Sequence, residues 1–217
     1  MVNLVNYASI KAELSLYDAQ LVAVSKTKPI EDIVSLKALG QSSFGENYVQ
    51  ELLTKQESQP NLKWHFIGHL QSNKVKSIAP FIHLIHGIDS LSLLNEVNKQ
   101  GEKLNRKISC LLQIFIAKEE TKFGFSSDEA EEILQHDVQT NFPFISIKGF
   151  MGMATNTNDS QLIRKEFKSL RLLFEKYQSE DFDILSMGMT NDYKIALEEG
   201  STLVRIGSAI FGERISD

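Results

Sequence analysis

Hydrophobic and polar residues divide the chain into short apolar runs, each followed by a segment whose apolar positions recur at helical spacing. Such runs are typical of strands that are covered on both faces in parallel sheets. The expected strands are 20–25, 43–45, 63–68, 82–88, 109–116, 144–151, 183–188 and 202–207, with an initial helix over 7–17 and a last helical turn at 208–211. Eight strand–helix units predict an α/β fold, a single (β/α)8 TIM barrel, as one domain over 1–217. An open doubly wound sheet is the alternative, and the count of eight argues against it.

Polar residues with helix-capping chemistry mark where several helices should begin. The expected N-caps are Asn47 with Gln50 three residues later, Ser72 or Asn73, Ser90, and Ser126 in a capping box with Glu129. In the helix that follows Ser90, the residues Leu91, Leu94 and Val97 should face inward. The longest helix follows strand 144–151, and its apolar residues at steps of three and four indicate core packing rather than a cofactor site.

Lys26 stands where the first strand ends. The apolar run Leu21–Val24 stops at Ser25 and Lys26, and Pro29 with Glu31 behind it opens a helix. Chemistry in α/β barrels is built at the carboxyl ends of the strands, so a lysine in this turn is a candidate nucleophile. On its position alone, a solvated lysine is the favoured interpretation, and only the rest of the chain reverses this preference.

The last two loops of the expected barrel carry hydroxyls and glycines. Barrels often bind phosphate after strands seven and eight, where 186–190 and Gly207–Ser208 fall. Singly, these residues are explained as caps and turns, but together they favour phosphate, and Arg205 lies beside them. A lysine, a phosphate site and an arginine around one mouth suggest a phosphorylated aldehyde held as a Schiff base. Pyridoxal 5′-phosphate is the obvious ligand.

Other polar residues give weaker signals. His65 and His86 lie in or beside strands and are expected to be structural or solvated, without the spacing of a zinc site, so no metal is expected. Only His69 is placed for the mouth of the barrel. Asn47 serves equally well as a helix cap or as a ligand contact, and Lys122 fits an exposed loop lysine.

Composition narrows the class of protein. The 217 residues carry a net charge of −5 and 42% hydrophobic residues, which is ordinary for a globular protein and argues against nucleic acid as a partner. The one cysteine, Cys110, lies in an apolar run and predicts a core thiol in a reducing compartment. No secretory signal or membrane span is visible, so we expect a cytoplasmic protein without a membrane partner, as a monomer.

Five motifs carry a resemblance to a known family. They are Val-Ser-Lys-Thr-Lys-Pro at 24–29, Phe-Gly-Glu-Asn-Tyr-Val-Gln-Glu at 44–51, Trp-His-Phe-Ile-Gly-His-Leu-Gln-Ser-Asn-Lys at 64–74, Ser-Met-Gly-Met-Thr-Asn-Asp at 186–192 and Val-Arg-Ile-Gly-Ser-Ala-Ile-Phe-Gly-Glu-Arg at 204–214. In this order the chain resembles the pyridoxal-phosphate homeostasis protein family, which is related in fold to the N-terminal barrel of alanine racemase.

The resemblance implies a role for each matched residue. Lys26 would carry the cofactor, Arg205 would face the pyridine nitrogen, and Asn47 would lie near the ring. The phosphate would be held by Ser186, Gly207 and Ser208, and a family lysine falls on Lys122. The loop after the fifth strand departs from the family because Phe115 and Ala117 stand where polar residues are usual, and Gly152 follows Met151.

Two functions from different classes follow. The family implies a non-catalytic carrier or buffer in vitamin B6 homeostasis, with apo pyridoxal-phosphate enzymes as possible recipients. The alternative is a small amino-acid racemase, which needs acid–base groups on both faces of the substrate carbon. Alanine racemases are expected to bring the second group from a further domain, for which this chain has no room. A phosphosugar enzyme that uses Lys26 without a cofactor is a third interpretation and predicts a colourless protein.

Overall fold

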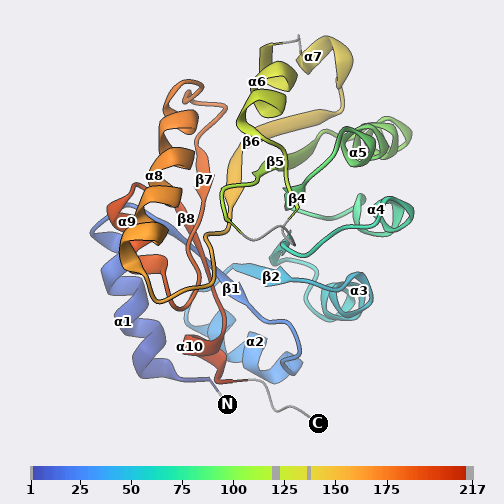
Figure 1. Ribbon diagram of the computed structural model, residues 1–217. Helices are drawn as coiled ribbons and strands as arrows, with labels where there is room; N and C mark the ends of the chain where they lie inside the picture. Colours follow the sequence, from blue (N-terminus) through green and yellow to red (C-terminus); the bar gives the residue numbers. More distant parts are fainter. Residues whose placement is uncertain (1, 119–122, 136–137, 214–217) are drawn as a thin grey trace.

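Eight parallel strands close into a barrel in the computed structural model, which describes residues 2–118, 123–135 and 138–213. Each strand pairs with the next in chain order, and the eighth returns to the first (Figure 1). The strands are β1 (Gln20–Val24), β2 (Ser43–Glu46), β3 (Lys63–Phe66), β4 (Leu84–Ile88), β5 (Ile108–Ile114), β6 (Ile145–Gly152), β7 (Ile184–Ser186) and β8 (Leu203–Ile206). The predicted (β/α)8 barrel is confirmed.

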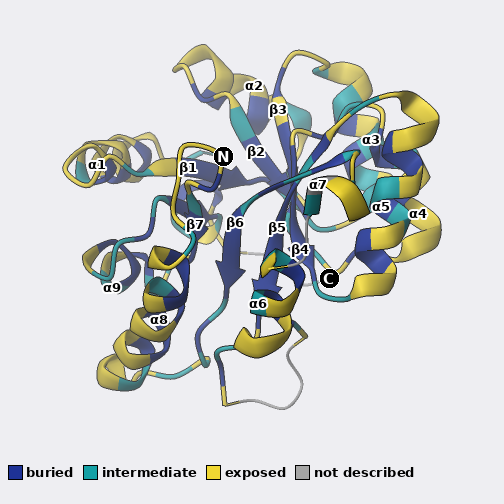
Figure 2. Cartoon of the chain, turned by 90° about the horizontal axis from the view of Figure 1, so that it is seen from above, coloured by how far each residue is buried: buried dark blue, intermediate teal, exposed yellow. Residues whose placement is uncertain are grey.

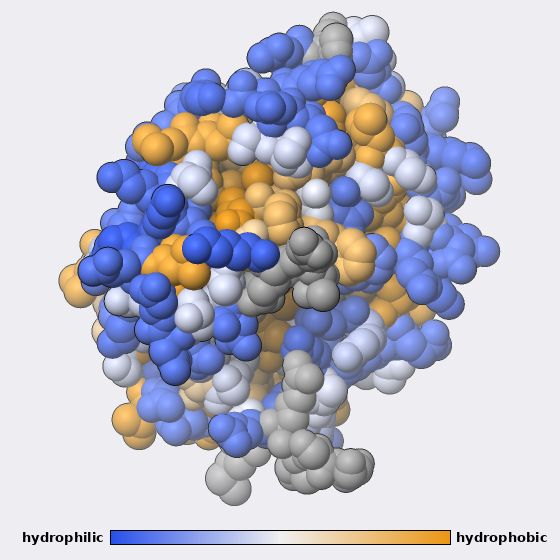
Figure 3. Space-filling view, in the orientation of Figure 1, coloured by the Kyte–Doolittle hydropathy of each residue, from blue (hydrophilic) through white to orange (hydrophobic). Residues whose placement is uncertain are grey.

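The helices surround this barrel. They are α1 (Leu4–Ser15), α2 (Ile30–Ala38), α3 (Val49–Ser58), α4 (Ser72–Ile78), α5 (Leu91–Leu104), α6 (Ser127–Gln135), α7 (Val138–Asn141), α8 (Ser160–Glu175), α9 (Tyr193–Glu198) and α10 (Ser208–Phe211). Figure 2 shows buried strands at the centre and exposed outer faces on the helices. In Figure 3, hydrophobic residues gather near the centre of the displayed face, and hydrophilic residues dominate its periphery.

The pairing of β1 with β8 brings the first motif, at 24–29, next to the last motif, which begins at Val204. Val22 lies opposite Arg205 in this parallel pair, and Ala23 lies opposite Ile206. Because the carboxyl ends of parallel strands meet at one edge, the turn after β1 and the turn after β8 are neighbours. The register therefore places Lys26 and Arg205 beside the same mouth.

Several predicted helix caps are confirmed and others are wrong. The Ser90 hydroxyl accepts from the Leu93 amide, and Ser126 and Glu129 exchange both bonds of the capping box. In contrast, α3 begins after Tyr48 and α4 after Gln71, and neither start has a side-chain cap. The caps predicted at Asn47 and at Ser72 or Asn73 are wrong because both helices start at another residue.

The inward face of α5 also differs from the expected one. Leu94 and Val97 are buried as predicted, but Leu91 is 51% exposed and Leu93 takes its place. Leu91 is the first residue of the helix, so its side chain lies over the helix start rather than against the barrel. The apolar stripe of α8 is buried as predicted through Ile163, Phe167 and Phe174.

Candidate functional site

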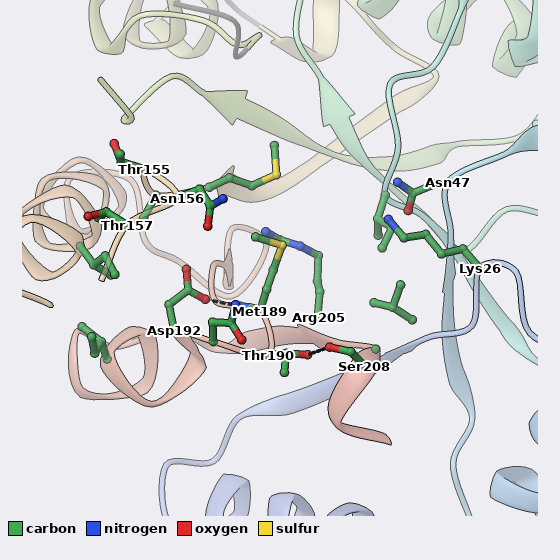
Figure 4. Close-up of a pocket in the computed structure, with 18 of the residues that line it drawn as sticks. Lys26, Asn47, Thr155, Asn156, Thr157, Met189, Thr190, Asp192, Arg205 and Ser208 are labelled. Atoms are coloured by element: carbon green, nitrogen blue, oxygen red, sulfur yellow. Dashed lines mark hydrogen bonds between the residues drawn. The ribbon is translucent and has the colours of Figure 1, made fainter. Parts of the chain in front are cut away.

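A cavity of about 700 Å³ opens at the carboxyl ends of the strands. Five of the six predicted cofactor-binding residues line it: Lys26, Asn47, Arg205, Gly207 and Ser208. Figure 4 shows Lys26 and Asn47 at one end, Arg205 near the middle, and Thr155, Asn156 and Thr157 at the other end. The volume lies within the range of small-molecule sites, so the cavity is large enough for a cofactor.

The backbone on both sides of Lys26 is fixed by buried polar contacts. The Ser25 hydroxyl donates to Glu46 Oε1 over 2.6 Å, and the Ser25 carbonyl accepts from Lys55 Nζ over 2.7 Å. On the other side, the Thr27 amide donates to Glu51 Oε1 over 2.6 Å. The turn that carries Lys26 is thereby attached to β2 and α3.

Thr27 adopts a left-handed backbone conformation, with φ of 62°. This conformation is costly for a β-branched residue, so the surrounding contacts must hold it in place. The hydrogen bond from its amide to Glu51 is one such contact. Backbone strain of this kind next to a candidate nucleophile is consistent with a functional turn.

Lys55 is the centre of this buried network, which we call the Lys55 cluster and define as Ser25, Glu46, Glu51 and Lys55. Its ammonium donates to Glu46 Oε1 over 2.8 Å and to Glu51 Oε1 over 2.7 Å. Burial raises the pKa of Glu46 to about 7, against the lowering effects of Lys55 and Ser25. Glu46, which contacts the residue before Lys26, therefore keeps its proton to a higher pH than an ordinary glutamate.

Arg205 is buried in the wall of the cavity. Its Nη1 donates to the carbonyl oxygen of Ser186 over 2.9 Å and to the Ser186 hydroxyl over 2.6 Å, and its Nη2 donates to the Gly152 carbonyl over 3.2 Å. Burial lowers the pKa of Arg205 to about 10, and Asp192 raises it. The side chain stays charged at neutral pH and is held by neutral oxygen atoms.

Ser186 lies beneath Arg205 and is not part of the cavity lining. It is fully buried, and its Oγ is 3.1 Å from Nδ1 of His86. His86 Nε2 is in turn 2.9 Å from Nδ1 of His65. The hydroxyl that sequence reasoning assigned to phosphate is instead occupied by Arg205 and His86, so its position favours support of the arginine.

Gly207 and Ser208 form the start of α10 at the cavity wall. The Ser208 hydroxyl donates to Thr190 Oγ1 over 3.1 Å, which joins the loops after β7 and β8 (Figure 4). A Cβ at Gly207 would lie 3.2 Å from both Cβ and the carbonyl oxygen of Val24. A side chain here would require Val24 to move by a few tenths of an ångström, so glycine suits the close approach of the β1 and β8 ends.

Asn47 lines the cavity beside Lys26. Its Oδ1 is buried and has no hydrogen-bond partner among the residues that the structure describes. A Cβ at Gly68 would collide with the backbone of Asn47, so glycine after β3 lets the two loops pack. Because buried polar atoms are normally paired, an unpaired amide oxygen in a cavity wall fits a ligand contact.

Other predicted residues lie apart from this cavity. His69 pairs with Asp89 over 2.9 Å and stacks on Phe123, outside the cavity lining. Lys122 lies outside the described residues. Cys110 is a buried core thiol as predicted, and burial raises its pKa to about 12. Among the described residues, no helix is long and apolar enough to cross a membrane.

Sequence reasoning missed the Lys55 cluster. Glu51 and Lys55 are four residues apart, a spacing that predicts only a helical surface pair. No local signal places their side chains under the first strand, because that contact depends on how α3 packs on the barrel.

Together, the fold and the cavity define a (β/α)8 barrel with an amine and a charged guanidinium at one small-molecule site. The family described as alanine racemase, N-terminal domain, matches residues 5–215. The chain is 39% identical over 203 residues to the pyridoxal phosphate homeostasis protein of Pasteurella multocida, covering 90% of this chain and 86% of that protein. This chain therefore belongs to the alanine racemase N-terminal domain family, among the pyridoxal phosphate homeostasis proteins.

Solved structures agree with this assignment. PipY from Synechococcus elongatus, determined without pyridoxal phosphate, has a TM-score of 0.88 and 31% identity and covers 95% of this chain and 98% of that chain. The PipY structure with pyridoxal phosphate bound has a TM-score of 0.83, 30% identity and the same coverage. Alanine racemase from Clostridium difficile, at 14% identity and a TM-score of 0.75, covers all of this chain and 58% of that chain, and shares the fold.

Proposed function

We propose that this chain binds pyridoxal 5′-phosphate on Lys26 as a Schiff base and acts as a carrier or buffer in vitamin B6 homeostasis. The observation that carries the proposal is the placement of Lys26 and Arg205 in one cavity, where β1 and β8 close the barrel: Lys26 lies in the turn after β1, and Arg205 lies on β8. The names of the homeostasis relatives and the ligand of PipY support the same cofactor.

The residues of the cavity fit this cofactor in charge and in hydrogen bonding. When bound, pyridoxal phosphate supplies an aldehyde that a primary amine can capture. Lys26 would provide that amine, Asn47 would offer its unpaired Oδ1 near the ring, and Arg205 would donate to the pyridine nitrogen. Gly207 and Ser208 would bind the phosphate from the start of α10, beside Thr190.

Ser186 takes a different place in this proposal than in the sequence-based one. Its hydroxyl accepts from Arg205 and lies outside the cavity lining. We therefore infer that Ser186 holds Arg205 in place, and that Gly207 and Ser208 bind the phosphate.

Arg205 also argues for storage rather than turnover. A charged guanidinium that donates to the pyridine nitrogen keeps that nitrogen unprotonated, which makes the ring a weaker electron sink. The relatives are named as homeostasis proteins, which points the same way. The proposed carrier is a monomer of residues 1–217 in one domain, works in the cytoplasm, and passes its cofactor to apo-enzymes.

Titration with pyridoxal phosphate tests the binding proposal. The wild-type protein should acquire a visible absorption band, and Lys26→Arg should lose it while keeping the charge. Lys28→Arg is the matched control, because the Lys28 amine donates to the carbonyls of Gly212 and Glu213. This variant should leave the absorption band unchanged. A band that survives in Lys26→Arg would rule out the proposed attachment.

Exchange of the α-hydrogen of amino acids with solvent tests the absence of turnover. The proposed carrier should exchange it far more slowly than ordinary enzymes, which turn over at about 1 per second or faster. Transfer of pyridoxal phosphate to an apo-enzyme should be detectable with the same preparation. Exchange at enzyme rates that Lys26→Ala abolishes would replace the carrier by the racemase alternative.

A further inference from the structure

Four buried side chains form a continuous hydrogen-bonded chain across the interior of the barrel. They are His65 on β3, His86 on β4, Ser186 on β7 and Arg205 on β8, and their exposed fractions are 3%, 0%, 0% and 4%. The joining distances are 2.9 Å between the two imidazoles, 3.1 Å from His86 to the Ser186 hydroxyl and 2.6 Å from that hydroxyl to Arg205. We call this set the histidine chain.

The donors and acceptors of the histidine chain favour one direction of hydrogen bonding. The Ser186 Oγ accepts from Arg205, and among the described residues its other partner is Nδ1 of His86. If the serine hydroxyl donates to this nitrogen, neutral His86 carries its proton on Nε2 and donates to Nδ1 of His65. His65 then carries its proton on Nε2.

The reverse direction leaves more polar groups unpaired. If His86 donated to Ser186, the serine hydrogen would have no acceptor among the residues that the structure describes. His65 Nε2 is buried without a partner in either direction. The first direction therefore leaves one unpaired group and the reverse leaves two, and each unpaired buried group is destabilising.

The favoured direction also suits the charge of Arg205. No carboxylate among the described residues forms a salt bridge with this guanidinium, which rests on neutral oxygens instead. In the favoured direction, the dipoles of the Ser186 hydroxyl and of both imidazoles point their negative ends toward Arg205. Burial keeps both imidazoles neutral, because it lowers the pKa of His65 to about 3 and holds the pKa of His86 well below its usual range.

This arrangement leaves the arginine with donors for a ligand. A guanidinium has five N–H donors, and the contacts to Ser186 and Gly152 use three of them. We propose that His86 and His65 are positioning residues of the cofactor site, which through Ser186 hold Arg205 oriented so that its remaining donors face the ligand. This inference rests on the proposed function, because the ligand atom that it concerns is the pyridine nitrogen.

Nitrogen-15 NMR of the unmodified protein without cofactor tests the direction of hydrogen bonding in the histidine chain. His86 and His65 should both appear as neutral Nε2–H tautomers at pH 7. A proton on Nδ1 of His86 would overturn the proposal, since the serine hydroxyl could no longer donate to that atom. This measurement needs no substitution and no bound ligand, so it does not depend on the proposed function.

The affinities of His86 variants for two ligands test whether the histidine chain acts on the cofactor. His86→Leu removes the acceptor for Ser186, while His86→Asn keeps an oxygen near the position of Nδ1. His86→Leu should weaken the binding of pyridoxal phosphate by about tenfold or more. This is the loss in affinity expected when one hydrogen bond to a charged group is misplaced. Its affinity for the 1-deaza analogue, which lacks the pyridine nitrogen, should stay within a factor of about two of wild type, and His86→Asn should resemble wild type with both ligands.

The outcomes separate the two proposals. Equal losses for the cofactor and its deaza analogue in His86→Leu, or no loss for either, would overturn the positioning role while the proposed function stands. A wild-type protein that binds neither ligand would overturn the proposed function, and the positioning role with it. The tautomers of the histidine chain would still be decided by NMR in that case.

Discussion

Lys26 and Arg205 line the same cavity, but the side chains beneath them differ in charge. The turn of Lys26 rests on the Lys55 cluster, in which a buried ammonium contacts two carboxylates. Arg205 rests on Ser186 and two imidazoles that burial keeps neutral. The candidate nucleophile is thus held by titratable ion pairs, and the candidate ring contact is held by uncharged hydrogen bonds.

This difference gives the two regions opposite responses to pH. The pKa of Glu46 is raised, so its contribution to the free energy of unfolding is full below about pH 4.5 and is lost as the pH rises through about 7. The pKa of His65 is lowered, so its contribution is full above about pH 6.5 and is lost as the pH falls toward about 3. Acid therefore weakens the Arg205 side, while mild alkali weakens the Lys26 side.

The largest effect is expected from His65. A pKa lowered from 6.5 to about 3 corresponds to up to about 5 kcal/mol between pH 6.5 and pH 3. As the pH falls, the free energy of unfolding of His65→Gln should therefore decrease less steeply than that of wild type. The part of the decrease that is due to His86 should remain. Urea denaturation at a series of pH values measures both slopes, and equal slopes would show that His65 is not a buried neutral imidazole.

Removal of Lys55 is expected to have a slightly smaller effect. Lys55→Met leaves Glu46 without its cation and should reduce the free energy of unfolding by about 3 to 5 kcal/mol at pH 8, and by less at pH 5, where Glu46 is protonated. Lys176→Met is the control, because Lys176 pairs with Glu131 at the exposed surface and should matter little. Similar losses in the two variants would contradict the ionic role of the Lys55 cluster.

The smallest of the three effects belongs to Glu46 itself. A pKa raised from 4.5 to about 7 corresponds to about 3 kcal/mol, lost between those pH values as the pH rises. Glu46→Gln should flatten the curve of unfolding free energy against pH in this interval and leave the acid loss in place. Parallel curves for wild type and variant would mean that Glu46 ionises at its ordinary pKa.

Much of the barrel could be predicted because each strand and each helix carries its own local pattern. The strands around Lys26 and Arg205 end in abrupt changes from apolar to polar residues, which placed both side chains at one mouth. Helix α7 escaped prediction because its four residues, Val-Gln-Thr-Asn, include only one apolar residue and so show no helical pattern. The cap predicted at Asn47 was wrong because α3 begins at Val49, which makes Tyr48 the residue that precedes the helix.

The supporting side chains could be predicted only in part. His65 and His86 were expected to be structural or solvated, and both are buried. The contact between His86 and Ser186 joins residues 100 positions apart and leaves no local signal. Ser186 was assigned to phosphate from its place in a loop motif, whereas the direction of its side chain depends on the packing of Arg205. Local patterns therefore located the cavity and left its supports to the tertiary structure.

Borohydride reduction of the protein loaded with pyridoxal phosphate, followed by mass spectrometry of its peptides, tests the central claim most directly. Fragment masses separate Lys26 from Lys28, which lines the same cavity. The cofactor should be found on Lys26 in the wild-type protein and on no lysine in Lys26→Arg. A stable adduct on Lys28, Lys74 or Lys122, or no adduct on the wild-type protein, would contradict the assignment of Lys26 as the residue that holds the cofactor.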